Sequence, residues 1–241
     1  PYRDNASPQC GFRRRVILLS NAKGPAAGRA PDHKAAKDTM TQKPKIALII
    51  GSTRQSRWAD TPAQWMLGKM QERTDFDVEL VDLRDYDLPL FDEVASNLWA
   101  PSQDPRAIRW QEKVKSYDGY MFVVAEYNRS VTGALKNALD QDYVGWNKKP
   151  MGMIAYGTMG GARAAEHLRL IAVELQMVPV RSAVHIGGSD FYRVIPNNPN
   201  MEPMAALEPI LANSVKDTLD QLSWYARALK VAREADAMLL A

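Results

Sequence analysis

Residues 46–54 read Ile-Ala-Leu-Ile-Ile-Gly-Ser-Thr-Arg, and this stretch decides the expected fold. Five consecutive apolar residues end at Gly51, a pattern typical of a short strand buried on both faces of a parallel sheet. In an open α/β sheet the ligand crevice lies beyond the carboxyl ends of the strands. The polar residues after the strand therefore predict a phosphate cradle made by Ser52, Thr53, Arg54 and Ser56.

Length and composition narrow the class of protein. The 241 residues suffice for one sizeable domain and barely for two. Hydrophobic residues make up 46% and charged residues 24%, as in an ordinary globular protein. No apolar run approaches the roughly 20 residues that cross a bilayer, so we expect a soluble, cytoplasmic protein without a membrane partner.

The formal net charge of +3 is unevenly distributed along the chain. Residues 1–39 hold eight basic and three acidic residues, whereas residues 40–241 hold 23 basic and 25 acidic residues. This nearly neutral body argues against a nucleic-acid partner. The single cysteine, Cys10, lies in the leading segment, so the body has no thiol for catalysis or metal ligation.

The leading segment, residues 1–39, shows no useful helical or strand periodicity. Its Pro, Gly, Ala, Arg and Lys content buries too little apolar surface to order a chain, and Met40 stands where an initiator methionine would lie. We expect a disordered or non-native extension, with a targeting peptide as the alternative. Residues 40–241 are then expected to form a single domain.

Strand and helix patterns alternate five times along that body. Such alternation predicts a three-layer, doubly wound α/β fold with a five-stranded parallel sheet in the flavodoxin-like order 2-1-3-4-5. The expected strands cover residues 46–50, 76–83, 120–125, 151–156 and 178–186.

The segments between the strands are expected to be helices and loops. Thr61 should cap the first helix with Pro62 in its first turn, and Ser130 should cap the helix after the third strand. Further helices are expected over residues 104–116, 162–177 and 201–240, the last broken near Pro209, and loops over residues 84–106 and 187–200.

Polar turns follow the first, third and fourth strands, so all three should converge on one crevice. The first turn has neither a Gly-x-Gly-x-x-Gly nor a Gly-Lys-Ser/Thr motif. Its hydroxyls, arginine and helix-start amides suit a terminal monophosphate. The alternative is a loop in which the serine and arginine side chains only cap a helix and contact solvent. In the second turn Tyr127 offers a flat face for an aromatic ring and Asn128 both a donor and an acceptor.

The third turn completes the expected site. Gly157, Gly160 and Gly161 remove side chains where a planar ligand would lie against backbone. The three turns offer a phosphate cradle, hydrogen-bonding groups for the polar edge of a ring, and glycines that leave room for a planar ligand. Together they describe a site for flavin mononucleotide (FMN). We expect His167 and His185 to be structural, because no carboxylate or serine is spaced to form a triad with them. No residue cluster suggests a metal.

Three motifs in order resemble the NADPH-dependent FMN reductase family. They are Gly51-Ser52-Thr53-Arg54, Glu126-Tyr127-Asn128-Arg129-Ser130 and Tyr156-Gly157 through Gly160-Gly161-Ala162-Arg163-Ala164, and the resemblance covers residues 44–190. Two departures stand out: Ala125 replaces the usual Pro, and residues 55–59 replace a turn richer in glycine and proline.

The resemblance implies a flavodoxin-like fold, non-covalent FMN, and reduction of flavin, quinone, azo or metal-oxyanion acceptors by NADPH or NADH. It also implies a homodimer or homotetramer. The flavin carries the hydride step, so we expect no catalytic side chain. By resemblance Ser52, Arg54 and Ser56 hold the phosphate, in the cradle that also contains Thr53, and Glu126, Tyr127 and Asn128 line the ribityl chain and the ring. The turn of Gly157, Thr158, Gly160 and Gly161 flanks the ring's polar edge. Arg129 or Arg163 is expected to attract the NADPH phosphate, with solvation at the surface as the alternative.

Two other functions stay open. A flavodoxin-like electron carrier would bind FMN without turnover of its own, although such carriers tend to be strongly acidic and this body is not. A phosphate-binding enzyme without flavin would use only the first turn.

Overall fold

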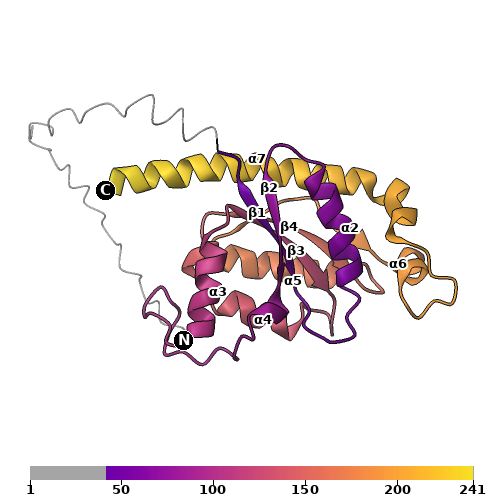
Figure 1. Ribbon diagram of the computed structural model, residues 1–241, viewed down its shortest axis with the longest axis horizontal. Coiled ribbons are helices and arrows are strands. Elements are labelled where there is room, and N and C mark those ends of the chain that lie inside the picture. Colours follow the sequence, from indigo (N-terminus) through magenta and orange to yellow (C-terminus); the bar gives the residue numbers. More distant parts are fainter. Residues whose placement is uncertain (1–41, 241) are drawn as a thin grey trace, which may run out of the picture.

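The computed structural model describes residues 42–240, and its centre is a parallel sheet (Figure 1). The strand order is β2-β1-β3-β4-β5, with β6 also paired to β4. This is the expected flavodoxin-like order, so the predicted fold class is confirmed. The expectations for residues 1–39 and Cys10 lie outside the described residues.

The strands are short, and the central ones are buried along their whole length. Every residue of β3 and β4 is buried, which explains their unbroken apolar sequences. The strands are β1 (Lys45–Ile50), β2 (Asp77–Asp82), β3 (Gly119–Ala125), β4 (Pro150–Tyr156), β5 (Val178–Pro179) and β6 (Val184–Ile186).

The expected fifth strand over residues 178–186 is wrong in one respect, because it is two strands. Pro179 pairs with Met151 and Val184 with Ile154. The chain thus advances five positions while β4 advances three, so two extra residues must leave the ladder between β5 and β6. An apolar pattern cannot reveal such a difference in length between partners.

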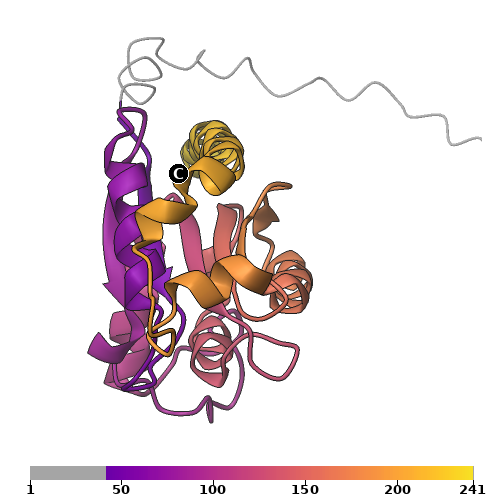
Figure 2. The same ribbon diagram turned by 90° about the vertical axis from the view of Figure 1, so that its right-hand side faces the viewer.

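Helices cover both faces of the sheet, which gives the three expected layers. One apolar core joins one face to residues of α2, α6 and α7, and a second core joins the other face to α3, α4 and α5. Figure 2 shows α7 nearly end-on beside the sheet. The helices are α2 (Asp60–Gln71), α3 (Pro105–Lys115), α4 (Gly133–Asp140), α5 (Ala162–Glu174), α6 (Gly188–Val194) and α7 (Glu208–Leu240), with short 3₁₀ turns η1 (Leu83–Asp85), η2 (Val144–Trp146) and η3 (Met204–Leu207).

Both predicted helix caps are misplaced. The N-cap of α2 is Ala59, so Thr61 lies inside the helix, although Pro62 is in the first turn as expected. The cap of α4 is Thr132, whose Oγ1 accepts a hydrogen bond from the Leu135 amide at 3.1 Å. Ser130 instead belongs to a tight backbone turn that starts at Tyr127, and that turn delays the helix by two residues.

The chain after β6 also differs from expectation. The segment 187–200 contains α6 rather than a loop throughout. The 33-residue α7 is continuous because Pro209 is its second residue, where the missing N–H removes no helical hydrogen bond. Among the described residues, no helix is long and apolar enough to cross a membrane.

The cap assignment gives a stability prediction for the flavin-free chain. Thr132→Val removes the cap of α4 and a hydrogen bond to the carbonyl of Gly51, and should lower the free energy of unfolding in urea by about 1–2 kcal/mol. The control Ser130→Ala should change it by less than about 0.5 kcal/mol. Equal losses in the two variants would contradict the assignment of Thr132 as the cap.

Candidate functional site

Three turns meet at the carboxyl edge of the sheet, as expected from the sequence. The hydroxyl of Thr132, after β3, donates to the carbonyl of Gly51, after β1. The amide of Glu126 donates to the carbonyl of Tyr156, at the end of β4, at 3.0 Å. The turns after β1, β3 and β4 are therefore joined to one another by hydrogen bonds.

The first turn, residues 51–56, is called the cradle loop below. Ser52 is buried, whereas Thr53, Arg54, Gln55 and Ser56 are exposed. Every carbonyl oxygen from Ser52 to Ser56 accepts a hydrogen bond. By contrast, no described group accepts a hydrogen bond from the backbone amides of residues 52–56. A run of amides without internal acceptors suits an anion.

Arg57 is a residue of the candidate site that the sequence analysis did not single out. Its side chain is only 2% exposed, and its Nη1 donates to the carbonyl of Ser52 at 2.6 Å and to Oδ1 of Asp82 at 2.7 Å. Its Nε donates to both carboxylate oxygens of Asp60, at 3.0 and 3.1 Å. The three-residue spacing of Arg57 and Asp60 could have indicated their pairing. Asp82 lies on β2, 25 residues further along the chain, so no local pattern indicates its contact with Arg57.

The charges of this network hold one another in the ionised state. Burial opposes the charged form of Arg57, but its hydrogen bonds to Asp82 and Asp60, together with their negative charges, outweigh burial and raise the pKa of the guanidinium. Burial alone would raise the pKa of Asp82, but the hydrogen bonds from Arg57 and from the Arg84 amide, together with the charges of both arginines, outweigh burial and lower that pKa. Arg57 therefore stays charged beneath the cradle loop, with its charge matched by two carboxylates.

Arg54 connects the cradle loop to the second turn. Its guanidinium carbon lies 5.8 Å from the ring centroid of Tyr127, and its Nη2 donates to the carbonyl of Ser56 at 3.3 Å. Tyr127 remains 37% exposed, which leaves part of its ring open to a ligand. Two residues predicted for the phosphate end and the ring end of the site thus lie in mutual contact.

The second turn has a left-handed backbone. Asn128 and Arg129 have φ values of 48° and 69°, and the amides and carbonyls of Tyr127 and Ser130 bond to each other at 2.9 and 3.0 Å. Such a turn suits Asn, whereas Arg129 is held there against its preference. The side chains of Asn128 and Arg129 are both exposed.

The two body histidines each have a specific contact. Nδ1 of His167 lies 2.6 Å from Oγ of Ser130, a contact that the sequence did not suggest. No described carboxylate bonds His167, and no triad results. His185 Nδ1 lies 2.7 Å from the carbonyl of Gly160 and supports the third turn. No cluster of metal-ligating side chains occurs among residues 42–240.

Glu126 has a role that the sequence did not suggest. Its carboxylate is nearly buried and pairs with the guanidinium of Arg163. Its Oε2 also accepts the amides of Arg163 and Ala164, at 3.1 and 3.4 Å, at the N-terminus of α5. A carboxylate is favoured there by the unpaired amides and the helix dipole. Glu126 therefore ties the second turn to the third.

The glycines of the third turn are required by the backbone itself. Gly160 and Gly161 have φ values of 68° and 66°. A Cβ on Gly161 would lie 2.7 Å from both the Cβ of Ala155 and the amide nitrogen of Tyr156. Gly157, with φ 150°, faces the Cβ of Glu126. Thr158 follows in the same turn, and its carbonyl accepts the amide of Gly188 at 3.0 Å.

An aromatic cluster explains the departure from the family pattern at residues 55–59. The ring of Trp58 lies edge-on to Tyr156, with centroids 4.9 Å apart, and to Phe191 of α6, at 5.5 Å. The Trp58 indole nitrogen donates to the carbonyl of Val194 at 3.0 Å. The bulky residue thus attaches the cradle loop to α6.

The comparisons with known proteins agree with this geometry. The sequence model described as NADPH-dependent FMN reductase matches residues 44–190. The NAD(P)H-dependent FMN reductase ntnL of a Nectria species is 33% identical over 162 residues, which is 63% of this chain and 80% of the relative. An FMN-dependent NADPH-azoreductase of Staphylococcus haemolyticus is 30% identical over 62% of this chain and 80% of its own length.

Among solved structures, the flavoenzyme FerB, an NAD(P)H:acceptor oxidoreductase from Paracoccus denitrificans, shares the fold. Its TM-score is 0.53 at 22% identity, with 74% of this chain and 98% of FerB covered. The sheet order, the three joined turns and these matches lead to one conclusion. The chain belongs to the NADPH-dependent FMN reductase family. It is an oxidoreductase of a family that uses FMN with NAD(P)H as co-substrate.

The crowding at Gly161 gives a testable consequence. Gly161→Ala meets both a left-handed φ and a backbone contact, and should lower the free energy of unfolding by at least about 2 kcal/mol. Gly188 has φ 53° but open space around its Cβ position, so Gly188→Ala should cost only about 1 kcal/mol. Urea denaturation of both variants measures the difference, and a smaller loss for Gly161→Ala would contradict the crowding.

The Asp82 carboxylate predicts an acid dependence. The pKa of Asp82 is lower in the folded than in the unfolded chain. Its contribution to the free energy of unfolding is therefore present above the pKa that it has in the unfolded chain, and is lost as the pH falls below about 4. Asp82→Asn should lower the free energy of unfolding by about 1–3 kcal/mol at neutral pH and flatten its decline in acid. Asp85→Asn is the control, since the Asp85 carboxylate forms no ion pair within residues 42–240. Parallel acid profiles for wild type and Asp82→Asn would contradict this reading.

Proposed function

We propose that this chain is an NAD(P)H-dependent FMN reductase that holds FMN non-covalently and passes electrons from NADPH or NADH to a small acceptor. The observation that carries the proposal is the run of backbone amides in the cradle loop that have no internal acceptor. These amides lie on a turn that is bonded to the second turn, which in turn is bonded to the third. The residues present therefore fit a ligand with a phosphate at one end and a planar ring at the other.

The proposed contacts follow from the placement of each turn. The amides of the cradle loop, with Ser52, Thr53, Arg54 and Ser56, bind the monophosphate. Tyr127, beside Asn128 and Arg129, borders the ribityl chain and the ring, and the turn of Gly157, Thr158, Gly160 and Gly161 borders the ring edge. Glu126 acts by holding the N-terminus of α5 against the second turn.

Bound FMN supplies the two-electron chemistry that links NAD(P)H to the acceptor. The side chains need only hold the cofactor and leave one side open, so no residue is proposed as a proton donor or acceptor. Arg129 and Arg163 are the proposed attractors of a nucleotide phosphate; Arg129 is exposed, and the Arg163 side chain is 34% exposed and its guanidinium pairs with Glu126.

The acceptor class rests on the names of relatives. One relative is an azoreductase, and a quinone reductase of Pseudomonas putida is also similar. We propose flavins, quinones, azo compounds or similar molecules as acceptors for this chain. A cytoplasmic location, a homodimer or homotetramer and a single domain over residues 40–241 stay predictions.

The alternative is a flavodoxin-like carrier that binds FMN without its own turnover. The nearly neutral body speaks against it, because such carriers tend to be strongly acidic.

One experiment decides among the functions. The full chain is loaded with FMN, its visible spectrum is recorded, and NADPH is added without air.

The reductase proposal expects a yellow protein that NADPH bleaches and that an added quinone or azo dye reoxidises. A yellow protein that NADPH does not bleach would favour the carrier. A chain that cannot be loaded with FMN would exclude both and leave a phosphate-binding enzyme.

Arg54 provides a residue-level test. Arg54→Ala removes a guanidinium at the cradle loop and should weaken FMN binding about tenfold, the range of one lost charge-assisted hydrogen bond. Arg169→Ala is the control, because Arg169 is a half-buried arginine of α5 that donates to a carbonyl outside the cradle loop, that of Arg181, at 3.0 Å. Fluorescence titration with FMN measures both, and equal affinities would remove Arg54 from the cradle.

A further inference from the structure

Two arginines that face the cradle loop bind its carbonyl groups. Arg57 donates to the carbonyl of Ser52 at 2.6 Å. Arg84, from η1 after β2, donates to the next three carbonyls: Nε to Thr53 at 3.4 Å, and Nη2 to Arg54 and to Gln55, the last at 3.1 Å. Four successive carbonyl oxygens of the loop are thus held by guanidinium groups.

The amides of the same loop have no such partners. No described acceptor bonds the N–H groups of residues 52–56. The carbonyls of residues 52–55 are bonded by guanidinium groups, and none of them accepts an amide of residues 52–56. The amides remain available to an external anion.

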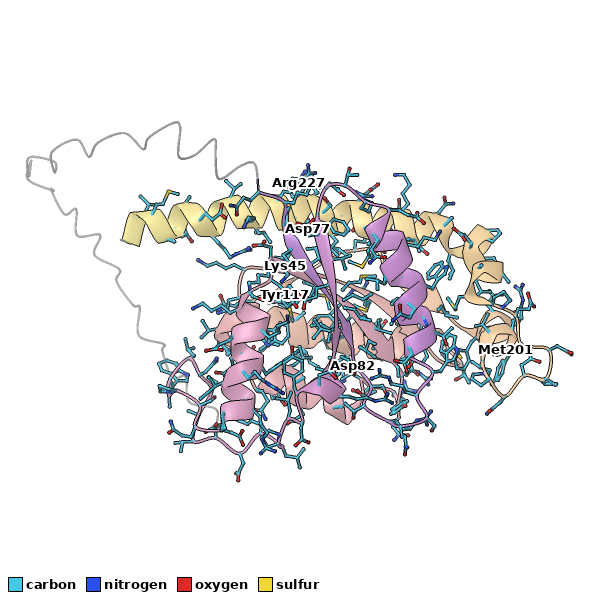
Figure 3. All side chains as sticks on the ribbon, in the orientation of Figure 1. Lys45, Asp77, Asp82, Tyr117, Met201 and Arg227 are labelled. Carbon is cyan, nitrogen blue, oxygen red and sulfur yellow. The ribbon has the colours of Figure 1, made fainter. Side chains whose placement is uncertain are left out.

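A single carboxylate places both arginines. Oδ1 of Asp82 accepts Nη1 of Arg57 at 2.7 Å and the backbone amide of Arg84 at 3.0 Å. Asp82 is the last residue of β2, and its register partner in β1 is Ile50, directly before the cradle loop. Figure 3 shows Asp82 at the end of β2 opposite to Lys45 and Asp77, which is the carboxyl end of the sheet.

The two arginines differ in charge balance. Arg57 is paired with Asp60 and Asp82, so its charge is largely matched. Arg84 forms no ion pair with any carboxylate in the described part of the chain, and its guanidinium is engaged by carbonyl oxygens alone. Arg84 lines a hollow of about 280 Å³ together with Thr53 and Asn137.

We infer that Arg84, together with Arg57, is a positioning residue that binds the carbonyl oxygens of the cradle loop and thereby keeps its backbone amides directed to a monophosphate. This inference rests on the proposed FMN site. It predicts that Arg84 governs the recognition of the phosphate but not of the flavin ring. The ratio of FMN affinity to riboflavin affinity therefore reports its role, because riboflavin lacks only the phosphate.

The test compares Arg84→Gln and Arg84→Lys with wild type by fluorescence titration of the full flavin-free chain with FMN and with riboflavin. In both variants the affinity ratio should fall by about tenfold or more, because neither side chain has the two separate nitrogen donors, Nε and Nη2, with which Arg84 reaches the three carbonyls. Riboflavin affinity should stay within about twofold of wild type. Arg109→Gln is the control, since the exposed Arg109 bonds only a carbonyl outside the loop, that of Asp85, at 2.6 Å.

Four results would overturn the inference. An unchanged affinity ratio in Arg84→Gln would show that the loop does not need Arg84. A wild-type ratio in Arg84→Lys combined with a loss in Arg84→Gln would assign the effect to charge alone. Equal losses for FMN and riboflavin would indicate general damage to the fold. A wild-type chain that binds neither flavin would contradict the proposed function itself, and the inference with it.

Discussion

The contact between Asp82 and Arg57 is the constraint on which the rest of the site depends. A guanidinium with 2% exposure is stable only when its donors are fully used. Here Asp82, Asp60 and the Ser52 carbonyl use them. The register of β1 against β2 fixes where Asp82 stands, and Asp82 then fixes the arginine on which the cradle loop rests.

The connections between the turns extend this constraint across the sheet. Thr132 bonds Gly51, and Glu126 bonds the first amides of α5. Trp58 attaches the cradle loop to α6 on the opposite side. Each of these side chains connects one turn or loop to a neighbouring turn or helix. The site is therefore a product of the packing of the sheet edge, rather than of any one motif.

The strands and their order were predictable because their cause is local. Runs such as residues 46–50 and 120–125 are apolar throughout, and only a strand buried on both faces requires this. The convergence of three turns then followed from parallel connections alone. By contrast, the split at Pro179 and Val184 depends on how many residues β4 offers opposite them, and no pattern within residues 178–186 contains that number.

The site was predictable at the level of turns but not of contacts. Ser130 and Thr132 are both good helix caps, and only the tight turn starting at Tyr127 decides between them. The sequence analysis did not single out Arg57 or Arg84, because Asp82 and the carbonyls that Arg84 binds lie 25 to 31 residues away along the chain. Glu126 was expected to face the cofactor, whereas its carboxylate is engaged by α5; its contact with FMN stays a prediction.

The held carbonyls of the cradle loop have a kinetic consequence. A loop that is already fixed by Arg57 and Arg84 loses little conformational entropy when a ligand arrives. Encounter is then limited by diffusion and orientation rather than by loop ordering. Substitutions within this loop would therefore change the residence time of a ligand more than its rate of association.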